Sequence, residues 1–331
     1  SSKAAHRVDV FDLKTGERRT IADAPGTLYP DGAEGGWMRE SLESVTWWDE
    51  EHIVYSKVRW AEQPSVYEGE AWLAAIDGSE QRLLAKGLFY RVLGVSGDES
   101  RLYVTRLIPE VWEWQREGFA VVDVASGRIR NLWPEEDRAG EGYFSFQLVR
   151  LPDGSPRVLF ATTHRVSTAA TKAPVIWVAD PETESAEQAL VVGEGRDQGS
   201  YTIYSLPREF LWSPFSDQEF LYLADYVGLG GIWKVDAAAH LSAQVPGTTA
   251  LGGEPWHHVL TWSRQGIVVG DAETLRLLTE AGEQVGEIML GESSLPVSRG
   301  IADAKVNWPV PYVHQVHDAP QWFDGGWSCG P

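Results

Sequence analysis

Cysteine, methionine and asparagine are scarce in this sequence of 331 residues, which holds one cysteine and two methionines. Cys329 has no partner within the chain, so a disulfide framework is excluded. The two asparagines, Asn131 and Asn307, do not begin an Asn-x-Ser/Thr glycosylation site. No apolar run approaches the ~18 residues that a membrane-spanning helix needs, and the sequence therefore predicts no membrane span.

Positive charge is also in short supply. The chain has 28 lysines and arginines against 48 aspartates and glutamates, a formal net charge of −20. A surface this acidic repels a phosphate backbone, so we expect no nucleic-acid partner. The first residues, Ser1-Ser2-Lys3, contain no apolar signal core, and we expect any targeting segment to have been removed or never to have been present.

Tryptophan and turn-forming residues are abundant, with 16 Trp, 33 Gly and 18 Pro. This composition is typical of short strands joined by tight turns. Almost no segment shows the 3.6-residue periodicity of an amphipathic helix. The sequence therefore predicts an all-β fold.

Two repeating units alternate along the chain. The first is an apolar strand, an Asp-containing turn and a second strand; its copies are 8–21, 72–84, 120–132, 175–192, 232–245 and 275–288. Its turn-entry residues are Asp12, Asp77, Asp123, Asp180, Asp236 and, with the acid replaced, Thr279. The second unit lies between these hairpins, at 45–58, 92–107, 148–163, 211–226 and 259–271. The spacing fits four-stranded blades of ~40–50 residues.

These repeats predict a β-propeller over residues 1–291, with five or six four-stranded blades and six favoured. The N-terminal hairpin at 8–21 lacks its inner strands. They are either missing upstream or supplied by residues 292–313, so that 292–304 is a linker or a ring-closing strand. Closure would remove an exposed sheet edge.

The repeats resemble those of TolB-like and dipeptidyl-peptidase-type propellers, in which a turn of the form Trp-Ser/Thr-x-Asp-Gly precedes the inner hairpin. The nearest matches are Trp212-Ser213-Pro214-Phe215-Ser216-Asp217 and Leu151-Pro152-Asp153-Gly154. The resemblance concerns the fold and implies no activity.

Residues 305–331 have a different character. Val310-Pro311-Tyr312-Val313-His314-Gln315 is followed by Asp318, by Phe323-Asp324-Gly325 and by Cys329-Gly330-Pro331. This order of residues resembles the opening of the C39-like group of papain-fold cysteine peptidases, whose central helix begins at a Cys-Gly-Pro. The resemblance predicts a C-terminal extended segment that begins a truncated papain-like domain near residue 305.

The resemblance implies that Cys329 is the nucleophile, with Gln315 as a side-chain donor to the oxyanion; Gln321 is a rival nearer to Cys329. In papain-like folds the histidine base and its Asp or Asn partner come from well downstream, so His314 and His317 are not carried over. We therefore expect the 331-residue chain to be inactive alone, and the natural protein to continue for ~100–200 residues, the size of one domain.

Other motifs give weaker signals. Gly326-Trp327-Ser328-Cys329-Gly330 matches the G-x-S-x-G elbow of serine hydrolases, but the loop-like residues before Ser328 disfavour it. Adjacent histidines in Trp256-His257-His258 would point to opposite faces of a strand, so a metal site is not expected. Tryptophans that line a ligand funnel or pack between blades are found at Trp37, Trp47, Trp48, Trp60, Trp72, Trp112 and Trp114, the last two flanking Glu113.

Two functions remain open. In the first, this is the propeller portion of a secreted or cell-envelope C39-like cysteine peptidase, which positions a peptide or protein substrate or a cell-envelope protein. In the second, the propeller is a free-standing binding or scaffolding module and 305–331 is a tail packed on it. Neither requires a cofactor.

Overall fold

The structure of the protein is a computed structural model. It describes residues 6–11, 17–24, 37–61, 67–108, 116–134, 141–166, 169–170, 173–192, 207–224, 230–248, 258–270, 274–289 and 313–317. Every regular element among these residues is a β-strand, which confirms the all-β prediction. Within these ranges no helix has the length and apolar character needed to cross a membrane.

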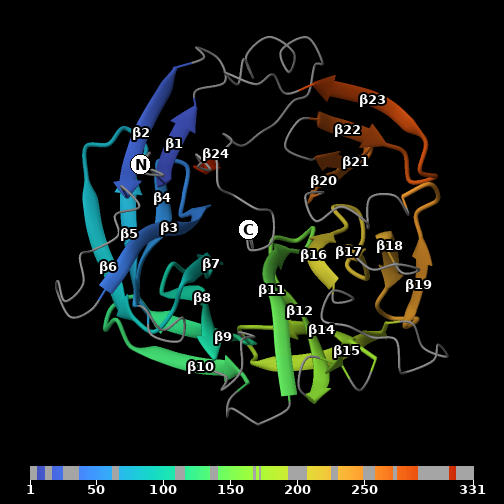
Figure 1. The fold of residues 1–331 in the computed structure, drawn as a ribbon, viewed down its shortest axis with the longest axis horizontal. Helices are drawn as coiled ribbons and strands as arrows, with labels where there is room; N and C mark the ends of the chain where they lie inside the picture. The colour runs from blue at the N-terminus through green and yellow to red at the C-terminus, as the bar shows by residue number, and fades with distance from the viewer. Residues whose placement is uncertain are drawn as a thin grey trace. The chain divides into compact units, whose positions relative to one another are not determined.

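The chain divides into two compact units, and the described residues of each form three antiparallel sheets, whose strands are labelled in Figure 1. Unit 1 comprises residues 1–111, 118–135 and 297–331, and unit 2 comprises 112–117 and 136–296. Consecutive strands in sheets two to six follow one another along the chain, as expected for hairpins, whereas in sheet one β1 also pairs with the distant β24.

Unit 1 holds the first three sheets. Sheet one has the order β2-β1-β24, sheet two β3-β4-β5-β6 and sheet three β10-β9-β8-β7. Their strands are β1 (His6–Phe11), β2 (Arg18–Ala24), β24 (Val313–His317), β3 (Trp37–Trp47), β4 (His52–Ala61), β5 (Tyr67–Ala75), β6 (Gln81–Gly87), β7 (Arg91–Val95), β8 (Arg101–Ile108), β9 (Arg116–Asp123) and β10 (Ile129–Trp133).

Unit 2 holds sheets four to six, with the orders β11-β12-β14-β15, β16-β17-β18-β19 and β20-β21-β22-β23. The strands are β11 (Glu141–Arg150), β12 (Pro156–Val166), β14 (Val175–Asp180), β15 (Ser185–Val191), β16 (Pro207–Trp212), β17 (Glu219–Ala224), β18 (Gly231–Asp236), β19 (Leu241–Gln244), β20 (His258–Ser263), β21 (Gly266–Gly270), β22 (Thr274–Leu278), β23 (Gln284–Met289) and the short β13 (Ala169–Ala170), which pairs with β12.

Both repeating units are present as hairpins. The first unit forms β1–β2, β5–β6, β9–β10, β14–β15, β18–β19 and β22–β23, and the second forms β3–β4, β7–β8, β11–β12, β16–β17 and β20–β21. The described residues thus form six sheets, in agreement with the favoured number of six blades. Sheet one has three strands, and its third strand, β24, comes from residues 313–317; residues 292–304 lie outside the described ranges.

The polar turns are held as the sequence predicts, by side-chain oxygens that accept backbone N–H bonds. The Asp77 carboxylate accepts from the N–H of Ser79 at 2.8 Å, and Asp123 accepts from Ser126 at 2.7 Å. Asp180 and Asp236 make the same kind of bond. At the turn without an acid, the Thr279 hydroxyl accepts from the N–H of Glu283 at 3.1 Å. Asp12 lies outside the described residues.

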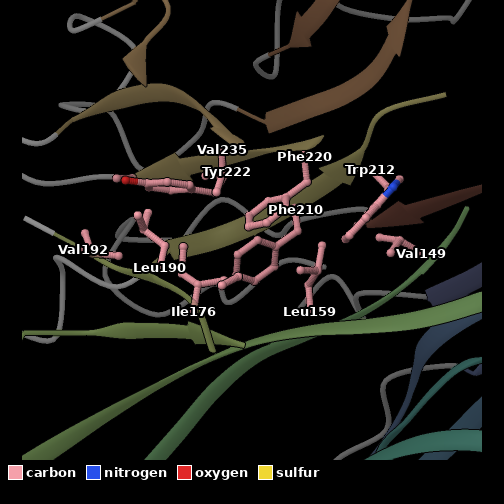
Figure 2. Packing of buried hydrophobic residues seen from close by; sticks show 12 residues of the cluster. Val149, Leu159, Ile176, Leu190, Val192, Phe210, Trp212, Phe220, Tyr222 and Val235 are labelled. Atoms are coloured by element: carbon pink, nitrogen blue, oxygen red, sulfur yellow. The ribbon is translucent and has the colours of Figure 1, made fainter. Parts of the chain in front are cut away.

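Buried aliphatic and aromatic side chains fill the space between sheets within each unit. In unit 2, residues of sheets four and five form one cluster, including Leu159, Ile176, Phe210, Phe220 and Val235 (Figure 2). In unit 1, the side chains Val54, Leu84, Val92, Val104 and Ala120 join sheets two and three. Apolar alternation along each strand therefore produces sheets that are buried on their packed faces.

The first strand of sheets two to six carries a β-bulge in each case. The bulges lie between Leu42 and Ser44, Val92 and Gly94, Phe144 and Gln147, Pro207 and Glu209, and Val259 and Thr261. A bulge bends the strand and turns a backbone group out of the ladder.

Three of the residues that follow these bulges bind the next sheet. The Ser44 hydroxyl accepts the N–H of Val92 at 2.7 Å in unit 1. In unit 2 the Gln147 side chain accepts from Phe210 at 2.7 Å. The Glu209 carboxylate accepts from Val259 at 2.7 Å. These bonds tie the first strands of neighbouring sheets together.

Candidate functional site

The two residues predicted to take part in catalysis are not brought together by the described part of the structure. Cys329 lies outside the described residues, as do Gln321 and Ser328. Gln315 lies in β24, where its backbone pairs with that of Val8 in β1. His314 pairs with Asp9, and His317 pairs with His6. The catalytic roles of Cys329 and Gln315 therefore stay predictions.

The strand that β24 joins contains a buried carboxylate. Asp9 is fully buried, and its carboxylate accepts hydrogen bonds from Arg18 and from the hydroxyl of Thr20, the latter at 2.7 Å. A buried charge needs such partners to offset its lost hydration. The Asp9 carboxylate therefore links β1 to β2 within the hairpin.

The remaining sequence motifs offer no metal site within the described residues. Trp256, His257 and 112–114 lie outside them. Among the side chains that are described, no three His, Cys, Asp or Glu groups lie close enough to hold a metal ion. Trp47 and Trp72 pack beside the core of sheets one and two, Trp48 packs beside that of sheets two and three, and Trp60 belongs to a separate cluster.

That separate cluster is the strongest candidate binding surface in unit 1. Arg39 in β3 pairs in register with Trp60 in β4, and Trp60 pairs with Tyr67 in β5. Cross-strand neighbours lie on the same face of a sheet, so these side chains form one row. Tyr90, just before β7, completes three mutually packed rings, Trp60, Tyr67 and Tyr90, which we name the aromatic triad.

The rings of the aromatic triad are close-packed. The ring centroids of Trp60 and Tyr67 are 5.6 Å apart, those of Trp60 and Tyr90 6.5 Å, and those of Tyr67 and Tyr90 6.4 Å with edge-to-face geometry. Tyr67 and Tyr90 are 3% and 8% exposed, whereas Trp60 is half-buried. Trp60 therefore presents the accessible part of the triad.

Hydrogen bonds fix the triad in place. The Tyr67 hydroxyl accepts the N–H of Leu107 at 2.7 Å and donates to its carbonyl at 3.2 Å. Burial raises the pKa of Tyr67 to about 12, despite the opposing effects of the Leu107 bond and of Arg106. The Trp60 indole N–H donates to the Ser41 hydroxyl at 2.8 Å, and Ser41 donates to the Glu43 carboxylate.

Two arginines stack on rings of the triad, Arg39 on Trp60 and Arg91 on Tyr90. The guanidinium carbon of Arg39 is 5.5 Å from the Trp60 ring centroid, and that of Arg91 is 4.8 Å from the Tyr90 centroid. Arg91 also donates to the Tyr90 hydroxyl at 2.8 Å. Cation–π stacking of this kind orients the guanidinium plane while its edge N–H groups stay able to donate.

The opposite face of the same strands carries paired charges. Glu40 is 7% exposed, and its carboxylate forms ion pairs with Lys57 Nζ at 2.7 Å and with Arg59 Nε at 3.3 Å. Lys86 bridges Glu68 at 2.9 Å and Glu70 at 3.5 Å. The hydrogen bond to Glu68 is the leading cause that raises the pKa of Lys86. The carboxylates on this face are therefore already engaged by cations.

The sequence indicated Trp60 as a residue that lines a funnel or packs between blades, but it did not indicate Arg39, Tyr67 or Tyr90. A signal for Tyr67 was available, because Trp60 and Tyr67 flank a short polar segment between two strands and would pair across it. Nothing local indicated Tyr90, which comes from the next sheet.

Comparison with known proteins identifies the fold. No protein-family model and no curated protein matches the chain. Among solved structures, an oligogalacturonate lyase in complex with manganese is similar with a TM-score of 0.52 and 12% identity, covering 84% of this chain and 70% of that one. A chain of a nidogen/laminin complex has a TM-score of 0.50 and 10% identity, covering 86% and 93%.

A structure described as a TolB from Agrobacterium tumefaciens has a TM-score of 0.47 and 14% identity, covering 86% of this chain and 90% of that one. At these identities the likeness concerns the fold alone. Together with the six antiparallel sheets, the similarity to the lyase establishes the chain as a β-propeller, as the repeats predicted.

Proposed function

We propose that this chain is the propeller portion of a C39-like cysteine peptidase, in which the propeller positions a peptide or protein substrate, or a cell-envelope partner, beside a papain-like domain that begins near residue 305. The observation that carries the proposal is the ordered match of Val310-Pro311-Tyr312, Gln315 and Cys329-Gly330-Pro331 to the start of such domains, at the C-terminal end of a chain whose preceding residues form propeller sheets.

In this proposal Cys329 is the nucleophile. A thiol of ordinary pKa, about 8.5, is largely protonated at neutral pH. A position at a helix N-terminus beside an imidazolium favours the thiolate. Attack of the thiolate on an amide carbon forms an oxyanion, for which the Gln315 side chain and the backbone N–H of Cys329 are the proposed donors. The His and Asp or Asn partners come from residues after Pro331.

The proposal places the protein at the cell envelope or outside the cell, where a peptidase meets peptide or protein substrates. It needs no cofactor, because the thiolate supplies the nucleophile.

Thiol reactivity of the protein that includes the residues encoded after Pro331 tests the proposal. We expect iodoacetamide to alkylate Cys329 rapidly well below pH 8, and Cys329→Ser to abolish both alkylation and peptide hydrolysis. Gln315→Ala should lower kcat and leave alkylation largely intact, since it acts on the oxyanion. Alkylation that follows the pH profile of an ordinary thiol would contradict the proposal.

A second candidate function is a free-standing binding module. The observation that favours it is the pairing of β24 with β1, because a tail packed on the propeller would form such contacts. The pairing is compatible with both functions, since Cys329 lies beyond the end of β24. A coding sequence that ends at Pro331, together with an inert Cys329, would support this second function.

A further inference from the structure

The geometry points to an anion-binding site at Arg39 and Trp60 that receives a carboxylate of a bound peptide. The site rests on the proposed function in one respect, namely that the ligand is a peptide. The site itself is argued from the contacts of Arg39, which neither the repeats nor the comparisons indicated.

Arg39 is an exposed cation without a counter-charge among the residues that the structure describes. Its guanidinium stacks on Trp60, with the guanidinium carbon 5.5 Å from the ring centroid, and makes no side-chain hydrogen bond or ion pair with those residues. The chain carries 48 acidic side chains, so an arginine without a carboxylate partner is unexpected. Its sequence neighbour Glu40 is engaged on the opposite face by Lys57 and Arg59.

The ring beneath Arg39 is held by several contacts. The Trp60 indole N–H donates to the Ser41 hydroxyl, and the Trp60 ring packs on Tyr67 and Tyr90. Tyr67 is in turn held by both backbone groups of Leu107. A preorganised cation loses little side-chain entropy when an anion binds, which raises its affinity relative to a mobile surface arginine.

The position of the site also suits a ligand. Arg39, Trp60 and Tyr67 lie at the end of sheet two where β4 stops at Ala61 and β5 starts at Tyr67. The turns held by Asp49 and Asp77 lie at the other end of the same strands. The half-buried Trp60 offers an apolar surface next to the cation, and loops at the ends of rigid strands commonly carry binding residues.

A guanidinium stacked on a ring presents its N–H edge for a bidentate bond to a carboxylate. The peptide carboxylate can come from an acidic side chain or from a C-terminus. The adjacent indole then packs against an apolar or aromatic residue of the same peptide. Inorganic phosphate and uronic-acid sugars carry related anions and serve as competing probes.

Isothermal titration of the 331-residue chain tests the site with Ac-Ala-Ala-Phe, its C-terminal amide and Ac-Ala-Glu-Phe-amide. We expect at least one carboxylate peptide to bind, and Ac-Ala-Ala-Phe-amide to bind much more weakly. Arg39→Gln should raise Kd about tenfold or more, as for loss of a charged hydrogen bond. Arg39→Lys, which keeps the charge but loses the planar stack, should recover only part of the affinity. The C-terminal and side-chain carboxylates are distinguished by which of the two peptides binds.

Arg264→Gln is the matched control. Arg264 stacks on Phe215 at the same 5.5 Å, but it lies in unit 2, and Phe215, which packs edge-to-face on Trp262, is itself 46% exposed. This variant removes the same charge and should leave Kd unchanged. A circular dichroism melt for each variant separates loss of binding from loss of folding.

Three results would overturn the inference: no binding of either carboxylate peptide at millimolar concentration, equal binding of the amide control, or a Kd that Arg39→Gln does not change. Binding of inorganic phosphate or of a uronic-acid disaccharide, but of no peptide, would overturn the assignment to peptides. Failure here while Cys329 is reactive in the extended protein would leave the peptidase proposal standing.

Discussion

At the scale of single residues, one buried hydroxyl can satisfy two backbone groups at once. Tyr67 satisfies both backbone groups of Leu107 while packing against two other rings. A buried N–H that loses its acceptor costs about 1–3 kcal/mol. Tyr67 is therefore a structural residue of the aromatic triad and not a titrating one.

We expect Tyr67→Phe to lower the free energy of unfolding by about 1–3 kcal/mol, because it leaves the Leu107 N–H without its acceptor. Tyr55→Phe is the control: Tyr55 is also buried, but its hydroxyl donates to the exposed Gln81 side chain at 3.2 Å, and its loss should cost less. Urea denaturation at pH 7 measures both. Equal losses would show that the Leu107 bonds are not what Tyr67 contributes.

The pH dependence of Tyr67 has a definite sign. Burial raises the pKa of Tyr67 from the ordinary 10 to about 12, so folding favours the protonated phenol. Its stabilising effect is fully present below pH 10 and is lost as the pH rises toward 12. The difference between wild type and Tyr67→Phe should therefore be constant from pH 6 to pH 9.

The turn aspartates behave in the opposite way. Asp98 accepts the hydroxyl of Ser96 at 2.6 Å and the hydroxyl of Ser100 at 2.8 Å, and these bonds lower its pKa to about 2. A lowered pKa means stability that is present above the unfolded value of 3.8 and lost as the pH falls through 2. The turn bonds therefore favour folding at neutral pH.

Asp98→Ala should lower the urea midpoint at pH 7, and the difference from wild type should shrink as the pH falls from 4 toward 2. Glu50→Gln, which removes an exposed carboxylate from the β3–β4 turn, should leave the midpoint nearly unchanged at each pH. If Asp98→Ala and wild type differed equally at pH 7 and pH 2.5, the turn bonds would not depend on the charged carboxylate.

At the scale of elements, the hairpins were predictable because their signals are local. An apolar alternation of period two and an Asp or Thr at the turn lie within ~15 residues, and each recurs along the chain. The bulges and the bonds between first strands were not predictable, because Gln147 and Phe210 are far apart in sequence. The same reason hid the aromatic triad, in which Tyr90 belongs to a different hairpin from Trp60.

Substitution of Glu209 tests the hydrogen bond that links β16, the first strand of sheet five, to β20, the first strand of sheet six. The Glu209 carboxylate accepts the N–H of Val259 at 2.7 Å. Glu209→Gln keeps an acceptor and should be tolerated, whereas Glu209→Ala should lower the free energy of unfolding by about 1–3 kcal/mol. Native-state hydrogen exchange at Val259 should accelerate in the alanine variant only. Similar exchange in both variants would mean that the bond does not protect this strand.

At the scale of the whole molecule, the sequence indicated six blades and a gap in the first one but did not locate the strand that fills it. The sequence left open strands missing upstream or supplied by residues 292–313; the strand that pairs with β1 is Val313–His317, and residues 292–312 lie outside the described ranges, so their part in the ring stays a prediction. A register between residues near the two ends of the chain has no local signature, and apolar alternation in 310–317 fits a peptidase start as well as a strand. The site of Cys329 and Gln315 is equally hard to predict from local sequence, because their proposed His and Asp or Asn partners come from another domain.

Removal of β24 tests how the two ends of the chain contribute to unit 1. A variant that ends at Tyr312 lacks β24 and exposes the edge of β1, whereas a variant that ends at Asp318 retains the strand. We expect the shorter variant to melt about 2–4 °C lower, or to associate through the unpaired edge, and the longer one to melt as the full chain does. Calorimetry and light scattering measure both effects. The two variants differ only in residues 313–318. Identical melting and no association would therefore mean that β24 does not stabilise sheet one. In that case Gln315 would be available to the domain that we propose begins near residue 305.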